Sequence, residues 1–234
     1  MDRSRYEELL PWAAVDGAQV VLVGVGGLNS YVGSAVARLG VGRVAAVDPD
    51  GVEEGNLGTQ DYDTRHVGMP KVEALAERMR EINPEIVVEA AQQRVPGWRP
   101  GGEYAMMVTG PDNMDARRAS WDLWKETGQG SVYVDHRMGA TSYEVYVVTS
   151  ARGTVGREYE RMLAEDTGYA KDLCGARAIA YTGMMAGSRV GAIVAGCLKA
   201  QLEGSVIPEG EEAWSLDWVT GAGAERIHRP RWRV

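Results

Sequence analysis

The chain is poor in cysteine. Its 234 residues include only Cys174 and Cys197, which lie 23 residues apart. Two cysteines cannot supply the four thiolates of a structural zinc site or the several bridges of a disulfide framework. We therefore expect no zinc, and we expect a reduced, cytoplasmic protein. The chain also lacks a run of about 18 apolar residues, the length that spans a bilayer, and its first residues lack the apolar core of a secretory signal. These absences predict no membrane partner.

Basic residues are the minority among the charges. There are 25 Lys and Arg against 33 Asp and Glu, which gives a formal net charge of −8. A uniformly basic surface is excluded, so we predict no nucleic-acid partner. Hydrophobic residues make up 44% of the chain, close to the average of globular proteins. The length fits one large domain or two small ones.

Short apolar runs alternate with helical patterns along the first 139 residues. Continuous runs such as AQVVLV at 18–23 and RVAAV at 43–47 are typical of strands buried on both faces of a parallel sheet. Apolar residues at helical spacing follow three of the runs. The pattern predicts an α/β fold with an open, mostly parallel, doubly wound sheet. Its expected strands are residues 18–23, 43–47, 86–90, 104–109 and 131–134, and its expected helices are residues 28–39, 71–82 and 116–127.

The two ends of the chain differ from this pattern. Residues 4–14 are predicted to form a short amphipathic helix. After Gly139, the segment YEVYVVT at 143–149 alternates like a strand that is exposed on one side, and residues 158–164 and 179–202 look helical. The tail from Trp214 alternates again. We predict that residues 1–139 form one α/β domain and that residues 140–234 extend its sheet with antiparallel strands.

A glycine-rich loop, Gly24-Val25-Gly26-Gly27-Leu28-Asn29, follows the first predicted strand and opens the first helix. Glycines let backbone N–H groups approach a phosphate, and a helix N-terminus attracts anions. Asp48 ends the second strand, where a carboxylate accepts hydrogen bonds from a ribose. The glycine loop and Asp48 together suit NAD as well as ATP. Each also has a purely structural alternative. The loop could be a tight turn that binds no ligand, and Asp48 could be a solvated strand end or a helix cap.

Three further motifs follow in order. They are DPDGVEEGNLGTQ at 48–60, VGMPK at 67–71 and Asp112-Asn113 after the fourth strand. Together with the glycine loop, they resemble the ubiquitin-activating superfamily that includes ThiF, MoeB and HesA, whose pattern is GxGGxG, DxDxVexxNLxRQ, vGxpK and tDN. The resemblance covers about residues 18–140. It implies a Rossmann-like fold, usually in a homodimer, with the C-terminal part facing the substrate.

The resemblance also implies a role for each matching residue. Gly24, Gly26 and Gly27 lie against the nucleotide phosphates, and Asp48 holds the ribose. Asn56 and Gln60 belong to the phosphate-contacting loop. Lys71 neutralises charge on the leaving pyrophosphate, Asp112 holds Mg²⁺, and Asn113 lies beside the phosphates. Lys71 and Asp112 are the predicted catalytic residues.

The implied reaction is the attack of a substrate carboxylate on the α-phosphorus of ATP, which yields an acyl-adenylate and pyrophosphate. The implied partner is a ubiquitin-like or sulfur-carrier protein, or a peptide with such a tail. Two alternatives stay open at this point. The chain is a catalytically weak relative that acts as a scaffold or binding subunit, or it is an NAD-dependent oxidoreductase, which leaves Lys71 and Asp112 unexplained.

The sequence departs from the family pattern in three ways. Thr59 stands where the family has the arginine of NLxRQ, Asn29 replaces the third glycine, and zinc cysteine pairs are absent. Candidates for the missing cation are Arg65 in the same loop and an N-terminal arginine, Arg3 or preferably Arg5, reaching across from a partner subunit.

Other positions keep two interpretations. Arg137, at the end of the fifth strand, is a candidate for binding the substrate carboxylate, whereas the adjacent His136 fits a structural histidine better. Cys174 is a candidate acyl or sulfur carrier, although a buried structural thiol fits it better.

The central motif residues also have structural alternatives. Lys71 fits an exposed residue at a helix start, Asp112 fits a cap for the following helix, and Asn56 fits a turn.

Overall fold

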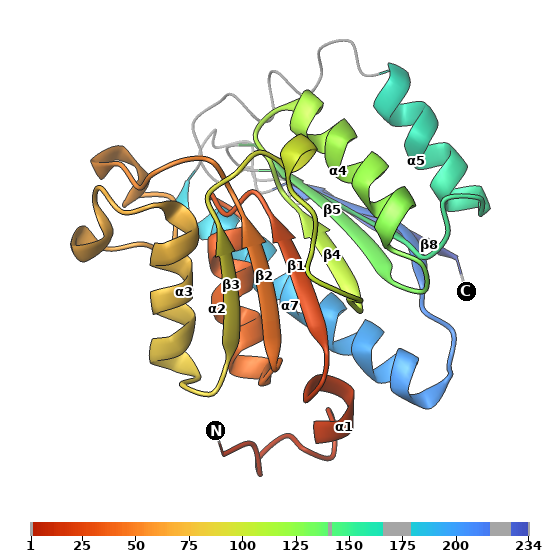
Figure 1. The fold of residues 1–234 in the computed structure, drawn as a ribbon. Helices are drawn as coiled ribbons and strands as arrows, with labels where there is room; N and C mark the ends of the chain where they lie inside the picture. The colour runs from red at the N-terminus through yellow and green to blue at the C-terminus, as the bar shows by residue number, and fades with distance from the viewer. Residues whose placement is uncertain (1, 140–141, 166–178, 216–225, 234) are drawn as a thin grey trace.

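The computed structural model describes residues 2–139, 142–165, 179–215 and 226–233. A sheet of eight strands runs through the molecule in the order β3-β2-β1-β4-β5-β6-β7-β8 (Figure 1). The five strands from β3 to β5 are parallel to one another, and β6, β7 and β8 continue the sheet in antiparallel pairs. The strands are β1 (Gln19–Val23), β2 (Arg43–Val47), β3 (Val87–Ala91), β4 (Met106–Thr109), β5 (Val132–Met138), β6 (Ser142–Val148), β7 (Glu209–Ser215) and β8 (Arg226–Arg233).

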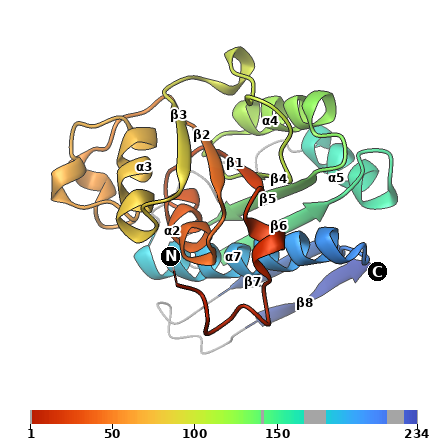
Figure 2. The same ribbon diagram turned by 60° about the horizontal axis from the view of Figure 1, so that its bottom comes forward.

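Helices cover both faces of the sheet. In Figure 2, α4 and α5 lie on one side of the strands, and α2 and α7 lie on the other. Helix α3 packs beside α2, and α7 makes its most extensive helix contact with α2. The helices are α1 (Trp12–Val15), α2 (Asn29–Leu39), α3 (Lys71–Ile82), α4 (Met114–Thr127), α5 (Thr154–Glu165) and α7 (Ala180–Glu203), with short 3-10 turns η1 (Glu54–Asn56), η2 (Thr64–His66) and η3 (Val95–Gly97).

The continuous apolar runs are explained by two separate cores, one on each face. Val20 and Leu22 of β1 pack with α2, α3 and α7, whereas Val21 and Val23 point the other way and pack with α4 and α5. All four side chains are buried. A fully buried valine or leucine contributes about 1.5–3 kcal/mol. The runs therefore specify a two-sided sheet, because a strand with one solvated face would alternate.

The structure confirms the predicted fold class, a doubly wound, mostly parallel sheet extended by antiparallel strands. Most boundaries differ by one or two residues, and α5 begins at Thr154 instead of residue 158. β5 reaches Met138 instead of ending at residue 134, because it continues as the partner of β6. The helix expected over residues 4–14 is wrong. Turns occupy most of that stretch, and α1 starts only after Pro11, whose ring and missing N–H disfavour a helix that runs through it.

Helix α7 packs closely on α2 because small residues face it. A Cβ atom built on Gly187 would overlap the Cβ of Tyr31, and one on Gly191 would lie 2.9 Å from the Cβ of Ala35. The same helix reaches the glycine loop at its N-terminal end, where Gly183 lies against the carbonyl of Gly27. Within the described residues, no helix combines the length and apolar character needed to cross a membrane.

Candidate functional site

A cavity of about 600 Å³ opens at the carboxyl ends of β1, β2, β3 and β4. This is the edge at which open α/β sheets bind their ligands. Most of the predicted site residues line it. The lining includes Gly24, Gly26, Gly27, Asp48, Asp50, Gln60, Lys71, Arg94, Asp112, Asn113 and Asp115.

The glycine loop needs glycine where it meets neighbouring backbone. Gly24 has a φ of +71°, and a Cβ there would lie 3.0 Å from Cα of Pro111 in the connection between β4 and α4. A Cβ on Gly27 would lie 2.9 Å from Cε of Met138 at the end of β5. A side chain at Gly24 would push the loop away from the backbone of Pro111, whereas the flexible end of Met138 could move aside for one at Gly27. The loop therefore keeps bare backbone at the start of α2.

Asn29 ties the glycine loop to the sheet. Its side-chain amide donates to the carbonyls of Val23 and Gly24 at 3.0 and 2.9 Å, and its Oδ1 accepts from Nε2 of His136 at 2.8 Å. His136 is fully buried, and burial, together with the charge of Arg117, lowers its pKa to about 3. It is a neutral structural residue, as the sequence favoured. The replacement of the third glycine by Asn29 thus adds buried hydrogen bonds.

Asp48 connects the glycine loop to the segment that follows β2. One carboxylate oxygen accepts the N–H of Val25 at 2.7 Å, and the other accepts the N–H of Asp50 at 2.8 Å. The side chain is buried, which raises its pKa, although these two hydrogen bonds and the charge of Lys71 act in the opposite direction. Each oxygen keeps a further lone pair. Asp48 can therefore hold the loop and still accept from a ribose hydroxyl.

Lys71 begins α3 and pairs with a neighbouring carboxylate of the cavity lining. Its Nζ lies 3.3 Å from Oδ2 of Asp50, and its backbone N–H donates to the carbonyl of Asp50 at 2.9 Å. The Lys71 side chain is 11% exposed, whereas that of Asp50 is 57% exposed. A cation at a helix N-terminus is unfavourable by itself. The carboxylate of Asp50 offsets this cost.

Asp112 and Asn113 have different roles at the start of α4. Asn113 caps the helix, since its Oδ1 accepts the N–H of Ala116 at 2.8 Å. The alternative that Asp112 is the cap is therefore wrong. Asp112 is exposed, and one of its oxygens accepts from the side-chain amide of Asn113 at 3.0 Å. Within the described residues, no group of three or more His, Cys, Asp or Glu side chains is placed to hold a metal. One available carboxylate suits Mg²⁺, which usually binds one or two carboxylates together with phosphate oxygens and water.

The loop after β2 contributes less to the cavity than its motif implied. Gln60 lines the cavity. Asn56 instead stabilises η1, because its Oδ1 accepts the N–H of Glu53 at 2.9 Å. Thr59, at the position of the missing arginine, donates its hydroxyl to the carbonyl of Asn56 at 3.3 Å. Asn56 is thus a turn residue here.

Arg65 and Arg137, two other predicted site residues, do not line the cavity. Arg65 pairs with Asp63 and Glu81 at 2.7 and 2.9 Å on the outer side of α3. Arg137 is buried, pairs with Asp135 at 3.1 Å and lies over the ring of Tyr146. Cys174 falls outside the described residues.

The N-terminal arginines lie at the opposite end of α2 from the glycine loop. Arg5 is exposed. Arg3 is buried, donates to the carbonyl of Leu39 at 2.7 Å and lies over the ring of Trp12. Neither lines the cavity of its own chain.

Arg94 lines the cavity, and the sequence analysis missed it. It lies three residues after the end of β3, at the same sheet edge as Asp48. Within the described part of the chain its guanidinium forms no ion pair. The signal was available, because every residue just after a parallel strand lies at the ligand-binding edge.

Comparison with known proteins agrees with this geometry. The model of the ThiF family matches residues 13–200. The sulfur carrier protein adenylyltransferase of Thermus thermophilus is 35% identical over 130 residues, which is 50% of this chain and 47% of that protein. The tRNA threonylcarbamoyladenosine dehydratase of Escherichia coli is 42% identical over 69 residues, which is 29% of this chain and 26% of that protein. The matches thus span about a quarter to a half of these relatives.

Solved structures show the same fold. Escherichia coli MccB in complex with ATP superposes with a TM-score of 0.68 at 16% identity, over 94% of this chain and 65% of that chain. The Escherichia coli dehydratase in complex with ATP superposes with a TM-score of 0.59 at 24% identity, over 86% of this chain and 92% of that chain. Because the family model covers most of the chain and the fold agrees, the chain belongs to the ThiF family.

Proposed function

We propose that the protein is a Mg-ATP-dependent adenylyltransferase that activates the C-terminal carboxylate of a ubiquitin-like or sulfur-carrier protein, or of a peptide, as an acyl-adenylate. One observation carries the proposal. A single cavity is lined by the glycine loop, Asp48, Lys71 and Asp112, which come from four separate segments of the chain. The relatives named as adenylyltransferases and ubiquitin-like modifier-activating enzymes support it.

The charges of the cavity explain the need for a metal. Four aspartates line it, against Lys71 and Arg94 as the cationic side chains among the described residues. Such a lining repels a free nucleotide polyphosphate unless cations accompany it. Asp112 has the exposed carboxylate that would hold Mg²⁺, and Asp50 is paired with Lys71. Bound Mg²⁺ supplies charge neutralisation on the phosphate oxygens.

In the proposed reaction, a carboxylate oxygen of the substrate forms a bond to the α-phosphorus of ATP. The bond from that phosphorus to the β-bridging oxygen breaks, and pyrophosphate leaves with the electron pair. Lys71 exchanges Asp50 for the phosphates and stabilises the leaving charge. The backbone of the glycine loop and the carboxylate of Asp48 orient the nucleotide. Positioning and charge neutralisation provide the catalysis.

We also propose that residues 140–234 face the acyl substrate. The glycine loop is bounded on this side by Met138 of β5 and Gly183 of α7, so the added strands and α7 border the phosphate end of the cavity. A homodimer would let the exposed Arg5 of one subunit approach the cavity of the other. We also expect the protein to be cytoplasmic.

Isothermal calorimetry tests the proposal at its first step. The titrants are ATP with Mg²⁺, ATP with EDTA, and NAD⁺, each against the wild type and Asp112→Ala. Metal-dependent ATP binding that is lost in Asp112→Ala supports the proposal. ATP–pyrophosphate exchange then identifies the acyl substrate among ubiquitin-like proteins, sulfur carriers and peptides with their tails. Binding of NAD⁺ alone would reject the proposal in favour of an oxidoreductase.

Thr59 favours a second candidate, a nucleotide-binding scaffold. The loop position that carries an arginine in the family pattern offers a hydroxyl here, and that hydroxyl is directed to its own loop. A scaffold would bind Mg-ATP without releasing pyrophosphate in the presence of any of these carboxylates, or would not bind ATP while remaining folded. Pyrophosphate exchange at normal turnover would exclude it.

A further inference from the structure

The hydroxyl group of Tyr62 lies behind the cavity, between two of its walls. It donates to the carbonyl of Val25 in the glycine loop at 2.6 Å and lies 3.2 Å from the carbonyl of Lys71 at the start of α3. The residue is 6% exposed. A single buried hydroxyl therefore contacts both the loop and the helix that would bind the phosphates.

This contact closes a ring of hydrogen bonds that includes three residues of the cavity lining, Asp48, Asp50 and Lys71. From Val25, the ring passes through its N–H to Asp48, and from Asp48 to the N–H of Asp50. The carbonyl of Asp50 accepts the N–H of Lys71 at 2.9 Å. Tyr62 then joins Lys71 back to Val25. Removing the hydroxyl would open this ring at the link between the glycine loop and Lys71.

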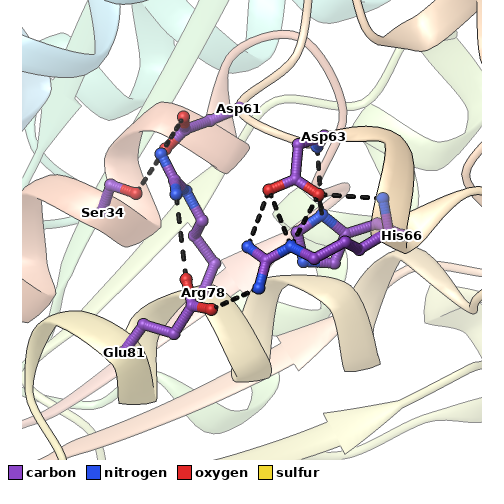
Figure 3. Close-up of polar contacts among 7 residues, drawn as sticks. Ser34, Asp61, Asp63, His66, Arg78 and Glu81 are labelled. Carbon is purple, nitrogen blue, oxygen red and sulfur yellow. Dashed lines mark hydrogen bonds and ion pairs between the residues drawn. The ribbon is translucent and has the colours of Figure 1, made fainter.

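The segment that carries Tyr62 is held in place by other contacts (Figure 3). On one side, Asp61 accepts from the hydroxyl of Ser34 on α2 and from Arg78 on α3, the latter at 3.0 Å. On the other side, Asp63 donates its N–H to Nδ1 of His66 at 3.0 Å. These contacts do not involve the Tyr62 hydroxyl. The segment is therefore expected to keep its place when only that hydroxyl is removed.

The hydroxyl is suited to act as a permanent donor. Burial raises the pKa of Tyr62 well above its ordinary value, and the charges of Asp48 and Asp61 act in the same direction. The group therefore stays protonated at neutral pH, and its one proton serves the two carbonyls.

We propose that Tyr62 is a positioning residue, whose hydroxyl fixes the glycine loop and Lys71 at the separation at which both reach the same nucleotide phosphates. The inference rests on the proposed function. It gives Tyr62 a role beyond packing, because a shift of about 1 Å between binding groups can reduce catalysis about a hundredfold.

The test compares Tyr62→Phe with Tyr104→Phe. Tyr104 is also buried, and its hydroxyl bonds to Oγ1 of Thr127 at 2.8 Å, but the residue precedes β4 at the opposite edge of the sheet. Both variants lose one buried hydroxyl. We expect similar shifts of the urea midpoint in the two variants. The Kd for Mg-ATP, measured by calorimetry, should rise about tenfold in Tyr62→Phe and stay within about twofold of the wild type in Tyr104→Phe, because a charge-assisted phosphate contact is worth at least that factor.

A double-mutant cycle separates positioning from general loosening. If Tyr62 acts through Lys71, adding Tyr62→Phe to Lys71→Ala should raise the Kd for Mg-ATP by less than about twofold. A further tenfold rise in that background would overturn the inference. If Lys71→Ala binds too weakly to measure, the comparison with Tyr104→Phe decides alone.

The outcomes also separate this inference from the proposed function. A wild type that binds Mg-ATP, together with a Tyr62→Phe variant that binds it equally well, rejects the positioning role and leaves the proposed function intact. A folded wild type that does not bind Mg-ATP rejects both.

Discussion

Two aspartates from neighbouring strands of the sheet have opposite environments. Asp112 follows β4, is exposed and accepts one hydrogen bond from Asn113. Asp135, within β5, is fully buried between Arg117 and Arg137. Both lie toward the ligand-binding edge. The difference shows that position at that edge is not enough, since a ligand also needs carboxylate oxygens that the protein has not already used.

The buried aspartate supports the exposed one. Arg117, held by Asp135, also donates to the carbonyl of Pro111 at 2.7 Å. Pro111 directly precedes Asp112 and contacts Gly24 of the glycine loop. The buried ion pair thus fixes the connection on which the exposed carboxylate stands. One aspartate serves the chemistry, and the other serves the scaffold.

The largest expected effect is on catalysis, and it comes from removing the exposed carboxylate of Asp112. Asp112→Ala should reduce pyrophosphate release with a carboxylate substrate about a thousandfold, equal to about 4 kcal/mol in the activation free energy. The reason is the loss of the carboxylate that would hold Mg²⁺. Urea unfolding should give the wild-type midpoint, because the side chain is exposed. Turnover close to that of the wild type would remove Asp112 from the mechanism.

Asp135→Ala should have the reverse profile. Removing this carboxylate leaves the buried Arg117 and Arg137 without their shared counter-charge, so the free energy of unfolding should fall by about 3 kcal/mol or more. Urea unfolding measures the loss, with Asp112→Ala as the matched control because it removes the same carboxylate from an exposed site. Equal stability of the two variants would contradict the distinction drawn between them.

The fold could be predicted from the sequence because its signals are local. The runs around Val21 and Ala45 indicate strands with two covered faces, and the glycine loop indicates the strand-to-helix turn. The order of the motifs then placed Asp48, Lys71 and Asp112 at one edge, and the structure brings them to one cavity. Each of these inferences needs only neighbouring residues and the rule that parallel strands share their carboxyl edge.

The remaining features depend on contacts between distant segments. Nothing near Asn29 in the sequence indicates that its side chain reaches His136, 107 residues away. The pairing of Arg137 with Asp135 makes it a buried structural charge, whereas the sequence suggested a substrate ligand. Tyr62 is unremarkable in the sequence, because its two carbonyl partners become neighbours only after the loop folds over the glycine turn.

The buried cluster should also affect the pH dependence of stability, through His136. Its pKa is lowered to about 3 in the folded protein, against about 6.5 for an ordinary histidine. The unfolded chain therefore binds one more proton between these values, and stability is lost as the pH falls below 6.5. Between pH 7 and pH 5 the loss from this residue should be about 2 kcal/mol.

Urea unfolding at both pH values, for the wild type and His136→Gln, measures this contribution. Glutamine keeps a side-chain donor for Asn29 but does not titrate. The wild type should lose about 2 kcal/mol more stability than the variant over the same interval. Equal losses would mean that His136 titrates normally and that the cluster is open to water.

The smallest effects concern the arginines, and they extend the same distinction to cations. Arg65 lies in the loop where the family pattern has an arginine and this chain has Thr59. Its guanidinium is already paired with two carboxylates, and it does not line the cavity. Arg94 lines the cavity and, within the described residues, forms no ion pair. Arg65→Ala should therefore leave the Kd for Mg-ATP within about twofold of the wild type. Arg94→Ala should raise it about tenfold, the value of one charge-assisted hydrogen bond.

Calorimetry on the two variants, with Thr59→Arg added to each, identifies the source of the cation. If Arg94 compensates for Thr59, then Thr59→Arg should restore Mg-ATP affinity in the Arg94→Ala background and change little in Arg65→Ala. Loss of affinity in Arg65→Ala alone would instead mean that its ion pairs with Asp63 and Glu81 break when the nucleotide binds. In that case, an ion pair seen without nucleotide would not show that an arginine is unable to bind the phosphates. The free guanidinium groups would have to be identified in the nucleotide-bound protein.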